Sequence, residues 1–222
     1  MGRKKRTTKQ KIVDAAWKLF YTKGYDETTI EDIIKESKTS KGSFYHYFKG
    51  KDALLGTLSD LFDQKYIELS EELDEHKPEM SASDKLLYLN HELFQMIADN
   101  VDIHLLAYMY GTQLTTDGER HLLNSSRFYF KYITEIIKEG LDSGEFDQRF
   151  TLNQLVKIYA MFERSMLYDW ALCKGKYSLT TISTYLLKSI LDRFRHGYDG
   201  AELDDNVKQT FIDAYISSRS DL

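Results

Sequence analysis

The sequence predicts an all-α fold for this chain of 222 residues. Apolar residues recur at intervals of three and four positions in successive segments, which is the pattern of amphipathic helices. The chain has one proline, Pro78, and few clusters of turn-forming residues. Between residues 28 and 51, two short helical patterns meet at the polar break Lys38–Ser40, as in a helix-turn-helix.

The first two helices have clear ends in the sequence. We expect the first at about residues 8–23, with Gly24 at its stop. The second follows Thr29, which can accept a hydrogen bond from the Asp32 amide while the Asp32 side chain reaches back, as in a capping box. Its inner face carries Ile30, Ile33, Ile34 and Ser37.

The third helix, at residues 41–48, has two different faces. Phe44 and Phe48 share one stripe, which we assign to the core. The opposite stripe is small and polar, with Gly42, Ser43 and His46 flanked by Tyr45 and Tyr47. Such a face suits the DNA major groove: Gly42 allows close approach, Ser43 and His46 can bond base edges, and the tyrosine hydroxyls can reach phosphates. The alternative is a solvated helix whose aromatic rings cover the core.

Charge favours the DNA interpretation. Residues 1–51 contain 13 Lys or Arg against 6 Asp or Glu, whereas the rest of the chain contains 17 against 29. The acidic total therefore conceals a basic end suited to phosphate contacts. Residues 2–11 (GRKKRTTKQK) are either an arm that follows the DNA backbone or minor groove, or a solubilising tail.

The remaining chain predicts further helices. A fourth, from Lys51 to about Leu73, would connect two domains, and Pro78 with the serines at 81 and 83 marks the boundary. Amphipathic patterns follow at about residues 86–97, 102–114, 119–140, 152–173 and 179–195. A possible extra helix after Gly200 has no readable purpose.

The segments 152–173 and 179–195 carry apolar residues on more than one face. A helix with a wide apolar circumference needs two neighbours. The second neighbour is either within the subunit or the same helix pair of another subunit, in an isologous four-helix contact.

Together these motifs resemble the amino-terminal domain of the TetR family of transcriptional repressors. The similarity runs in order through KIVDAAWKLFYTKG (11–24), Gly24-Tyr25, Thr28-Thr29-Ile30, Asp32-Ile33, SKGSFYHYF (40–48) and Lys51-Asp52-x-Leu54-Leu55. The resemblance implies a homodimer with a three-helix DNA-reading head, a connecting helix and a larger helical domain for effector binding and dimerisation. The corresponding ranges are 1–51, including the basic arm, 52–76 and 77–222.

The resemblance also assigns DNA contacts. Thr29 would touch phosphate, the segment 40–43 would enter the groove, Tyr45 and His46 would contact bases or backbone, and Tyr47 and Lys51 would hold phosphates. The full expected set is Thr29, Thr39, Ser40, Lys41, Gly42, Ser43, Tyr45, His46, Tyr47 and Lys51. Where the family usually has Ala-Gly-Val before Ser-Lys-Gly, this chain has Ser37-Lys38-Thr39, so a non-glycine residue is expected at a turn that favours positive φ.

The expected function is sequence-specific regulation of transcription, with repression relieved when a small effector lowers affinity for a palindromic operator. Candidate effector-binding residues form an aromatic and methionine-rich set, in which most members are equally interpretable as core. They are Tyr108, Phe128, Tyr132, Phe162, Met166, Tyr168 and Trp170. Glu163, Arg164 and Asp169 could select a charged ligand, although an ion pair is the simpler role. The alternative function is an architectural or partner-recruiting DNA-binding protein without an effector.

Other classes find little support. The six histidines show no catalytic spacing, so we expect no enzyme, and there is no CxxC or HxxxH pair for a metal. We expect no cofactor. The single Cys173 excludes an internal disulfide, and it is either a small buried hydrophobe or a thiol sensor. With no membrane-length apolar run and no signal region, we expect a cytoplasmic protein.

Overall fold

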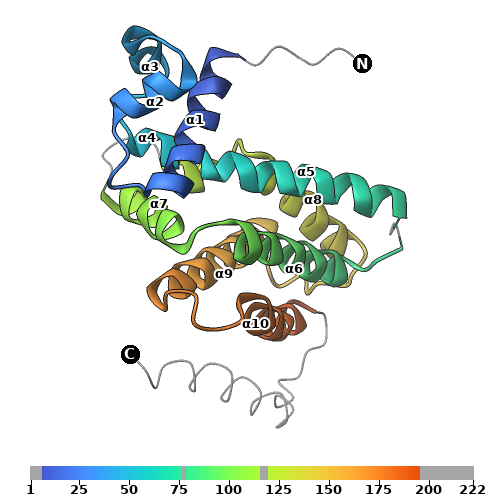
Figure 1. Ribbon diagram of the computed structural model, residues 1–222. Helices are drawn as coiled ribbons and strands as arrows, with labels where there is room; N and C mark the ends of the chain where they lie inside the picture. Colours follow the sequence, from blue (N-terminus) through green and yellow to red (C-terminus); the bar gives the residue numbers. More distant parts are fainter. Residues whose placement is uncertain (1–6, 77–78, 116–119, 196–222) are drawn as a thin grey trace. The chain divides into compact units, whose positions relative to one another are not determined.

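The computed structural model describes residues 7–76, 79–115 and 120–195, and this part of the chain is helical throughout, which confirms the all-α prediction (Figure 1). The helices are α1 (Thr8–Lys23), α2 (Ile30–Ser37), α3 (Lys41–Tyr47), α4 (Asp52–Leu55), α5 (Leu58–His76), α6 (Ala82–Asn100), α7 (Ile103–Thr115), the short 3-10 helix η1 (His121–Leu123), α8 (Phe128–Asp142), α9 (Leu152–Leu172) and α10 (Leu179–Phe194).

The chain folds as two compact units. The head unit comprises the described residues within 1–61 and 104–123, and the body unit comprises those within 62–103 and 124–222. Residues 2–6 of the basic arm and the tail after Gly200 lie outside the described residues.

In the head unit, α1 packs against α2 and α3 (Figure 1). The apolar side of each helix faces this contact, so Ile12, Phe20, Ile33 and Phe44 are almost completely buried. Gly24 ends α1. Its φ of 90° is positive, and glycine adopts a positive φ without steric cost because it has no Cβ atom.

The fourth predicted helix is interrupted, and the prediction of one continuous helix from Lys51 was wrong. It forms as α4 and α5, separated at Gly56 and Thr57. The backbone there makes i to i−3 hydrogen bonds, from Thr57 to Leu54 and from Ser59 to Gly56. The Thr57 hydroxyl donates to the Leu54 carbonyl and accepts from the Trp17 indole at 2.9 Å, so α1 holds this break in place.

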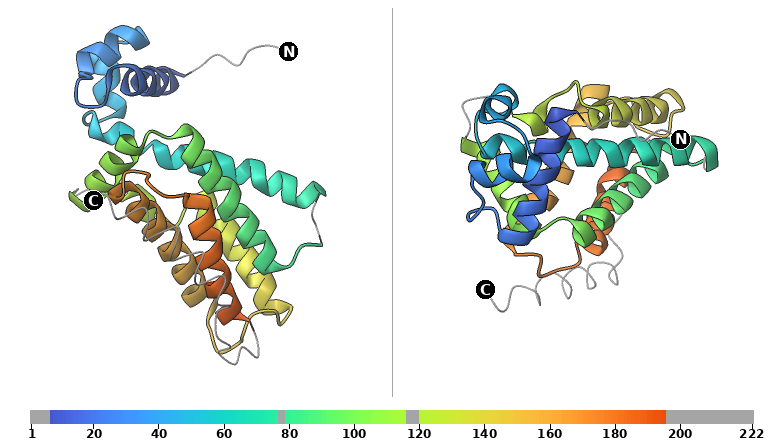
Figure 2. Two further views of the ribbon diagram at one scale, coloured as in Figure 1. Left: turned by 60° about the horizontal axis from the view of Figure 1, so that its bottom comes forward. Right: turned by 45° about the horizontal axis from the view of Figure 1, so that its top comes forward.

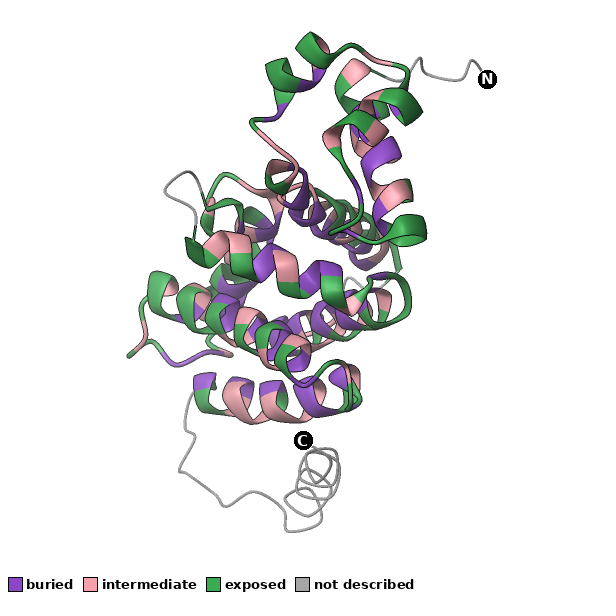
Figure 3. Ribbon diagram, turned by 60° about the vertical axis from the view of Figure 1, so that its left-hand side comes forward, coloured by how far each residue is buried: buried purple, intermediate pink, exposed green. Residues whose placement is uncertain are grey.

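In the body unit, α6 packs against α8 and α10, and α9 packs against α8 and α10 (Figure 2). Buried positions recur along the sides of these helices, with exposed positions on their other sides (Figure 3). Leu86, Phe94, Ile137, Leu155 and Leu187 are completely buried in this core. No helix in the described residues is long and apolar enough to span a membrane.

The helix predicted from residue 119 begins later, at Phe128. The Asn124 side chain accepts hydrogen bonds from the backbone and hydroxyl of Ser126, which forms a local turn in place of a helix. Arg127 then adopts an extended conformation, and its guanidinium binds Asp63 of α5 through two nitrogens, at 2.8 and 3.1 Å. The Asn124 turn and the Arg127–Asp63 ion pair explain why the apolar pattern alone predicted too early a start for α8.

Candidate nucleic-acid interface

The helix that would read DNA is held by a capped neighbour. The Asp32 amide donates to the Thr29 hydroxyl at 3.1 Å, and the Thr29 amide donates to the Asp32 carboxylate at 3.0 Å, so the predicted capping box is confirmed. The Lys23 ammonium also binds Asp32, and this bond with those from Thr29 lowers the pKa of Asp32 to about 2. The carboxylate therefore stays charged at the start of α2, where the helix dipole favours an anion.

The turn between α2 and α3 is tight. Lys38 has a φ of 54° and a ψ of 41°, the left-handed conformation expected where the chain lacks glycine. Ser40 then caps α3, since its hydroxyl accepts from the Ser43 amide at 3.0 Å. The two helices are thus fixed with a short, hydrogen-bonded connection.

Helix α3 has the two faces that its sequence predicts. Phe44 and Phe48 are buried in the head core, with 0% and 5% of their surfaces exposed. On the other side Gly42 and His46 are exposed, and Tyr45 and Tyr47 keep 48% and 41% of their surfaces. Most of the expected DNA-binding residues are therefore accessible on one continuous segment.

The two lysines of the expected DNA set have other partners. Lys41 forms an exposed ion pair with Glu31 at 3.4 Å, which leaves it able to exchange partners. Lys51 is more constrained: its ammonium donates to the Tyr25 carbonyl at 2.7 Å and lies 4.2 Å from the centre of the Tyr25 ring. These contacts compete with the phosphate contact that the sequence predicts for Lys51.

The expected effector residues do not form a single group. Tyr108 belongs to the head unit, where its ring lies 4.5 Å from that of Tyr25 and its hydroxyl donates to Asp26. The others belong to the body unit. Phe128 and Tyr132 stack on α8 with ring centres 5.6 Å apart.

The effector residues of α9 differ in exposure. Met166 and Trp170 are buried, Phe162 is half-buried, and Tyr168 is 41% exposed. The Trp170 indole donates to the Tyr177 carbonyl at 3.0 Å, which ties α9 to the loop before α10. Cys173 in this loop is buried, and its Sγ lies 3.8 Å from the Asp169 carboxylate.

The body unit contains a buried polar cluster around Glu163 that the sequence analysis did not predict. Glu163 is 4% exposed and accepts hydrogen bonds from Tyr66, Asn90 and Tyr159, each at 3.0 Å, and from Tyr129. Burial raises the pKa of Glu163 above its ordinary value, although these hydrogen bonds act in the opposite direction. The prediction of an ion pair was wrong for Glu163, because its partners in the described residues are hydroxyls and an amide. The described residues contain no group of three or more His, Cys, Asp or Glu that could hold a metal.

Comparison with known proteins agrees with this architecture. Residues 12–58 match the family model "Bacterial regulatory proteins, tetR family", and residues 62–192 match "YsiA-like protein, C-terminal region". The fatty acid metabolism regulator protein of Bacillus subtilis (strain 168) is 22% identical over 191 residues, which cover 85% of this chain and 96% of the relative. The regulator QacR of Staphylococcus aureus is 28% identical over 142 residues, covering 62% and 72%.

Solved structures share the fold. Thermus thermophilus FadR, a TetR-family repressor crystallised with lauroyl-CoA, has a TM-score of 0.71 and 23% identity, with 89% of this chain and all of that chain covered. Bacillus subtilis FadR with stearoyl-CoA has a TM-score of 0.62 and 22% identity, with 82% and 97% covered. The two family models together span the helix-turn-helix and the body helices. The chain belongs to the TetR family of bacterial regulatory proteins and is a DNA-binding regulator of transcription, in a family whose members act as dimers and respond to small molecules.

Proposed function

We propose that the protein is a repressor that binds a palindromic operator as a homodimer and is released by a long-chain acyl-CoA thioester. The single observation that carries the DNA half is the exposed face of α3, where an exposed histidine and two exposed tyrosines stand opposite a buried pair of phenylalanines. Residues 1–51 would be the DNA-binding domain, 52–76 the connection, and 77–222 the effector-binding and dimerisation domain.

In this proposal the α3 face enters the major groove. Ser43 and His46 read base edges, because a hydroxyl and an imidazole can each donate or accept a hydrogen bond. Tyr45 and Tyr47 contact base or backbone, and Thr29 binds a phosphate at the start of α2, where the dipole favours an anion. Thr39, Ser40, Lys41 and Gly42 complete the segment at the groove, and Lys51 would need to exchange its carbonyl partners for a phosphate.

The dimer half is supported by an apolar stripe on α9. Ile158, Met161, Tyr168 and Leu172 lie at spacings of three, seven and four residues, and they are 37%, 50%, 41% and 57% exposed. This spacing places them on one side of the helix. Four large apolar side chains in line are suited to an isologous contact with the same helix of a second chain.

The effector half is supported by the chain's similarity to the two FadR regulators crystallised with acyl-CoA thioesters. An acyl chain needs an apolar, aromatic lining. Phe128, Tyr132, Phe162, Met166 and Trp170 of the body unit have that chemistry. Tyr108 and the exposed Tyr168 would serve at most at an entrance.

The test has two stages. DNA bound by the purified protein is selected from random duplexes, and its affinity is then measured by fluorescence anisotropy during titration with lauroyl-CoA. We expect a two-fold symmetric site and release by lauroyl-CoA at concentrations where coenzyme A and laurate have no effect. A regulator without an effector would keep its DNA affinity in the presence of lauroyl-CoA, coenzyme A and laurate. That result would refute release by an acyl-CoA and leave the proposed DNA binding untouched.

A further inference from the structure

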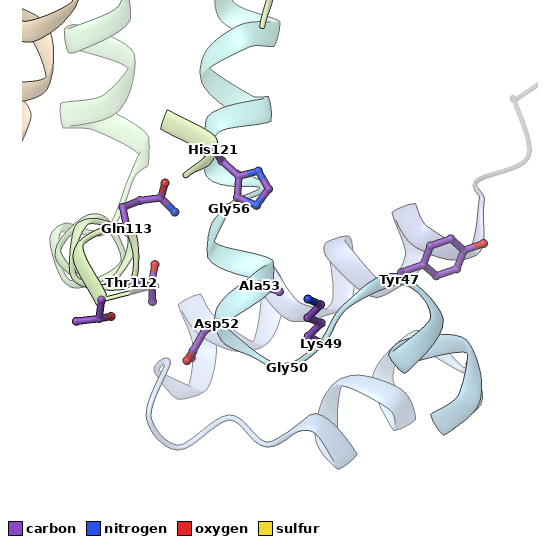
Figure 4. Close-up of a pocket in the computed structure, with 10 residues that line it drawn as sticks. Tyr47, Lys49, Gly50, Asp52, Ala53, Gly56, Thr112, Gln113 and His121 are labelled. Atoms are coloured by element: carbon purple, nitrogen blue, oxygen red, sulfur yellow. The ribbon is translucent and has the colours of Figure 1, made fainter. Parts of the chain in front are cut away.

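A cavity of 620 Å³ lies within the head unit, lined by residues of the segment between α3 and α5, by the end of α7 and by the first residue of η1 (Figure 4). Its volume is within the range of small-molecule sites, about 300–1,000 Å³. The segment between α3 and α5 contributes Lys49, Asp52 and Gly56, while α7 contributes Gln113 and η1 contributes His121. All of these residues belong to one compact unit.

Three polar side chains of the cavity, those of Lys49, Gln113 and His121, can donate hydrogen bonds to a ligand. Within the described residues, the Lys49 ammonium makes no hydrogen bond or ion pair. The Gln113 side-chain oxygen accepts from the Leu122 amide at 3.3 Å, which leaves its NH₂ group as a donor. The one carboxylate in the lining, that of Asp52, already accepts from the Tyr25 hydroxyl. A ligand would therefore meet a cation, an amide donor and an imidazole.

One side of the cavity is closely packed. A Cβ atom added to Gly56 would lie 2.6 Å from Cδ2 and 3.0 Å from Nε2 of His121, so the imidazole rests directly on the glycine backbone. Gly56 is also the point at which α4 and α5 separate, where the hydroxyl of Thr57 is held by Trp17. The imidazole and the Gly56 backbone therefore pack without a gap on this side of the cavity.

We propose that this cavity is a second ligand site, distinct from the effector pocket of the body, and that it binds a small molecule carrying a phosphate or carboxylate group. The Lys49 ammonium binds the oxyanion, and the Gln113 NH₂ group and the His121 ring donate to the oxyanion or to hydroxyls next to it. Charge-assisted hydrogen bonds of this kind are stronger than neutral ones and select the anion over an uncharged analogue. The proposal goes beyond the acyl-CoA response and does not depend on it.

The test uses three probes with the same hexose body. Glucose 6-phosphate, glucuronate and glucose are titrated into the full-length protein by isothermal titration calorimetry at fixed ionic strength. We expect saturable binding of one oxyanion probe per chain, at least about tenfold tighter than glucose, which corresponds to ~1.4 kcal/mol. Comparison of glucose 6-phosphate with glucuronate shows whether the site prefers a phosphate or a carboxylate.

Two variants locate the site, and a third controls for charge. Lys49→Gln removes the cation and Gln113→Leu removes the amide donor, while Lys188→Gln makes the same charge change at an exposed position of α10 in the body unit. Lys49→Gln should weaken the oxyanion probe at least about tenfold and Gln113→Leu about threefold, with Lys188→Gln within a factor of two. Circular dichroism checks that each variant is folded.

Three outcomes would overturn the proposal: no saturable binding of either oxyanion, equal binding of glucose, or equal weakening by Lys49→Gln and Lys188→Gln, which would mean an adventitious ion only. Failure of the acyl-CoA proposal would appear separately, as an unchanged operator affinity in lauroyl-CoA. The two proposals can therefore fail independently.

Discussion

The Tyr66 hydroxyl lies 3.0 Å from both carboxylate oxygens of Glu163 in the core of the body unit. Tyr66 belongs to α5 and Glu163 to α9, and the Asn90 amide of α6 reaches the same carboxylate. The Tyr129 hydroxyl of α8 donates to it as well, so one acidic side chain joins α5, α6, α8 and α9 through neutral donors. Among the described residues, the Asn90 side-chain oxygen has no hydrogen-bond partner although it is fully buried, so this polar cluster is not completely satisfied.

Glu163→Gln should change how stability depends on pH. The folded-state pKa of Glu163 is raised by burial, so the carboxyl lowers the free energy of unfolding progressively as pH rises from the unfolded pKa of about 4.3 through the folded pKa. Glutamine cannot ionise and keeps an acceptor oxygen. We expect the melting temperature of Glu163→Gln minus that of the unmodified protein to increase from pH 5 to pH 8. Glu135→Gln, at an exposed position of α8, should show no such trend. A difference that is constant or declines with pH would contradict this account.

His46→Ala should reduce DNA specificity more than it reduces general DNA affinity. A base-edge contact contributes about 1–3 kcal/mol of discrimination, whereas non-specific binding depends on phosphate contacts. Tyr45→Ala should weaken binding to specific and random duplexes alike. The measurement is anisotropy titration of the selected operator and a scrambled duplex at several salt concentrations. Tyr21→Ala, which removes a tyrosine of similar exposure from α1, is the control. Equal sequence preference in His46→Ala and the unmodified protein would rule out the assignment.

Met161→Glu should dissociate the dimer. The residue is 50% exposed in the centre of the α9 stripe, and a two-fold contact would bring two new carboxylates together. Burial of unpaired charges should weaken association by at least about 2 kcal/mol, roughly a thirtyfold rise in the dissociation constant. Sedimentation equilibrium measures this directly. Leu123→Glu changes a residue of equal exposure, 53%, in the head unit and should leave association unchanged. Similar effects of both variants would place the interface elsewhere.

Lys38→Gly should stabilise the head unit. Lys38 adopts a φ of 54°, which costs a non-glycine residue about 1–2 kcal/mol, and the greater unfolded-state entropy of glycine offsets about 0.5–1 kcal/mol of the gain. The expected net gain is roughly 0.5 kcal/mol, observable as a higher urea midpoint in unfolding followed by tryptophan fluorescence. Lys35→Gly, within α2, should lower the free energy of unfolding by about 1 kcal/mol and therefore lower the urea midpoint. A midpoint lowered by both changes would show that the turn carries no such strain.

Local features of the fold were predictable because they depend on neighbours in the chain. Gly24, the Thr29–Asp32 capping box and the Ser40 cap each satisfy helix ends within a few residues. The burial of Phe44 and exposure of Tyr45 follow from the 3.6-residue period. The outward face of α3 was therefore predictable from the sequence, and its contacts with DNA stay a prediction.

Features that depend on distant residues were not predictable in this way. At the break, the ring of His121 packs on Gly56 and the indole of Trp17 donates to Thr57, and both partners lie far away in sequence. The helical period in the Lys51–Leu73 segment continues through the break, so the sequence pattern did not predict it. Glu163 likewise appeared suited to an ion pair, and packing of α5 and α6 against it supplies the partners Tyr66 and Asn90, which lie far away in sequence. Tertiary contacts override local pattern at each of these places.

Cys173 gives the protein a built-in reporter of motion. It is the only cysteine in the chain, and only 2% of its surface is exposed, at the end of α9 beside the Trp170 contact. A thiol reagent can reach it only when this loop opens, so the alkylation rate of the native protein measures that opening without any engineered label. Slower alkylation in the presence of a compound would reveal closure of this end of α9, and a faster rate would reveal its release.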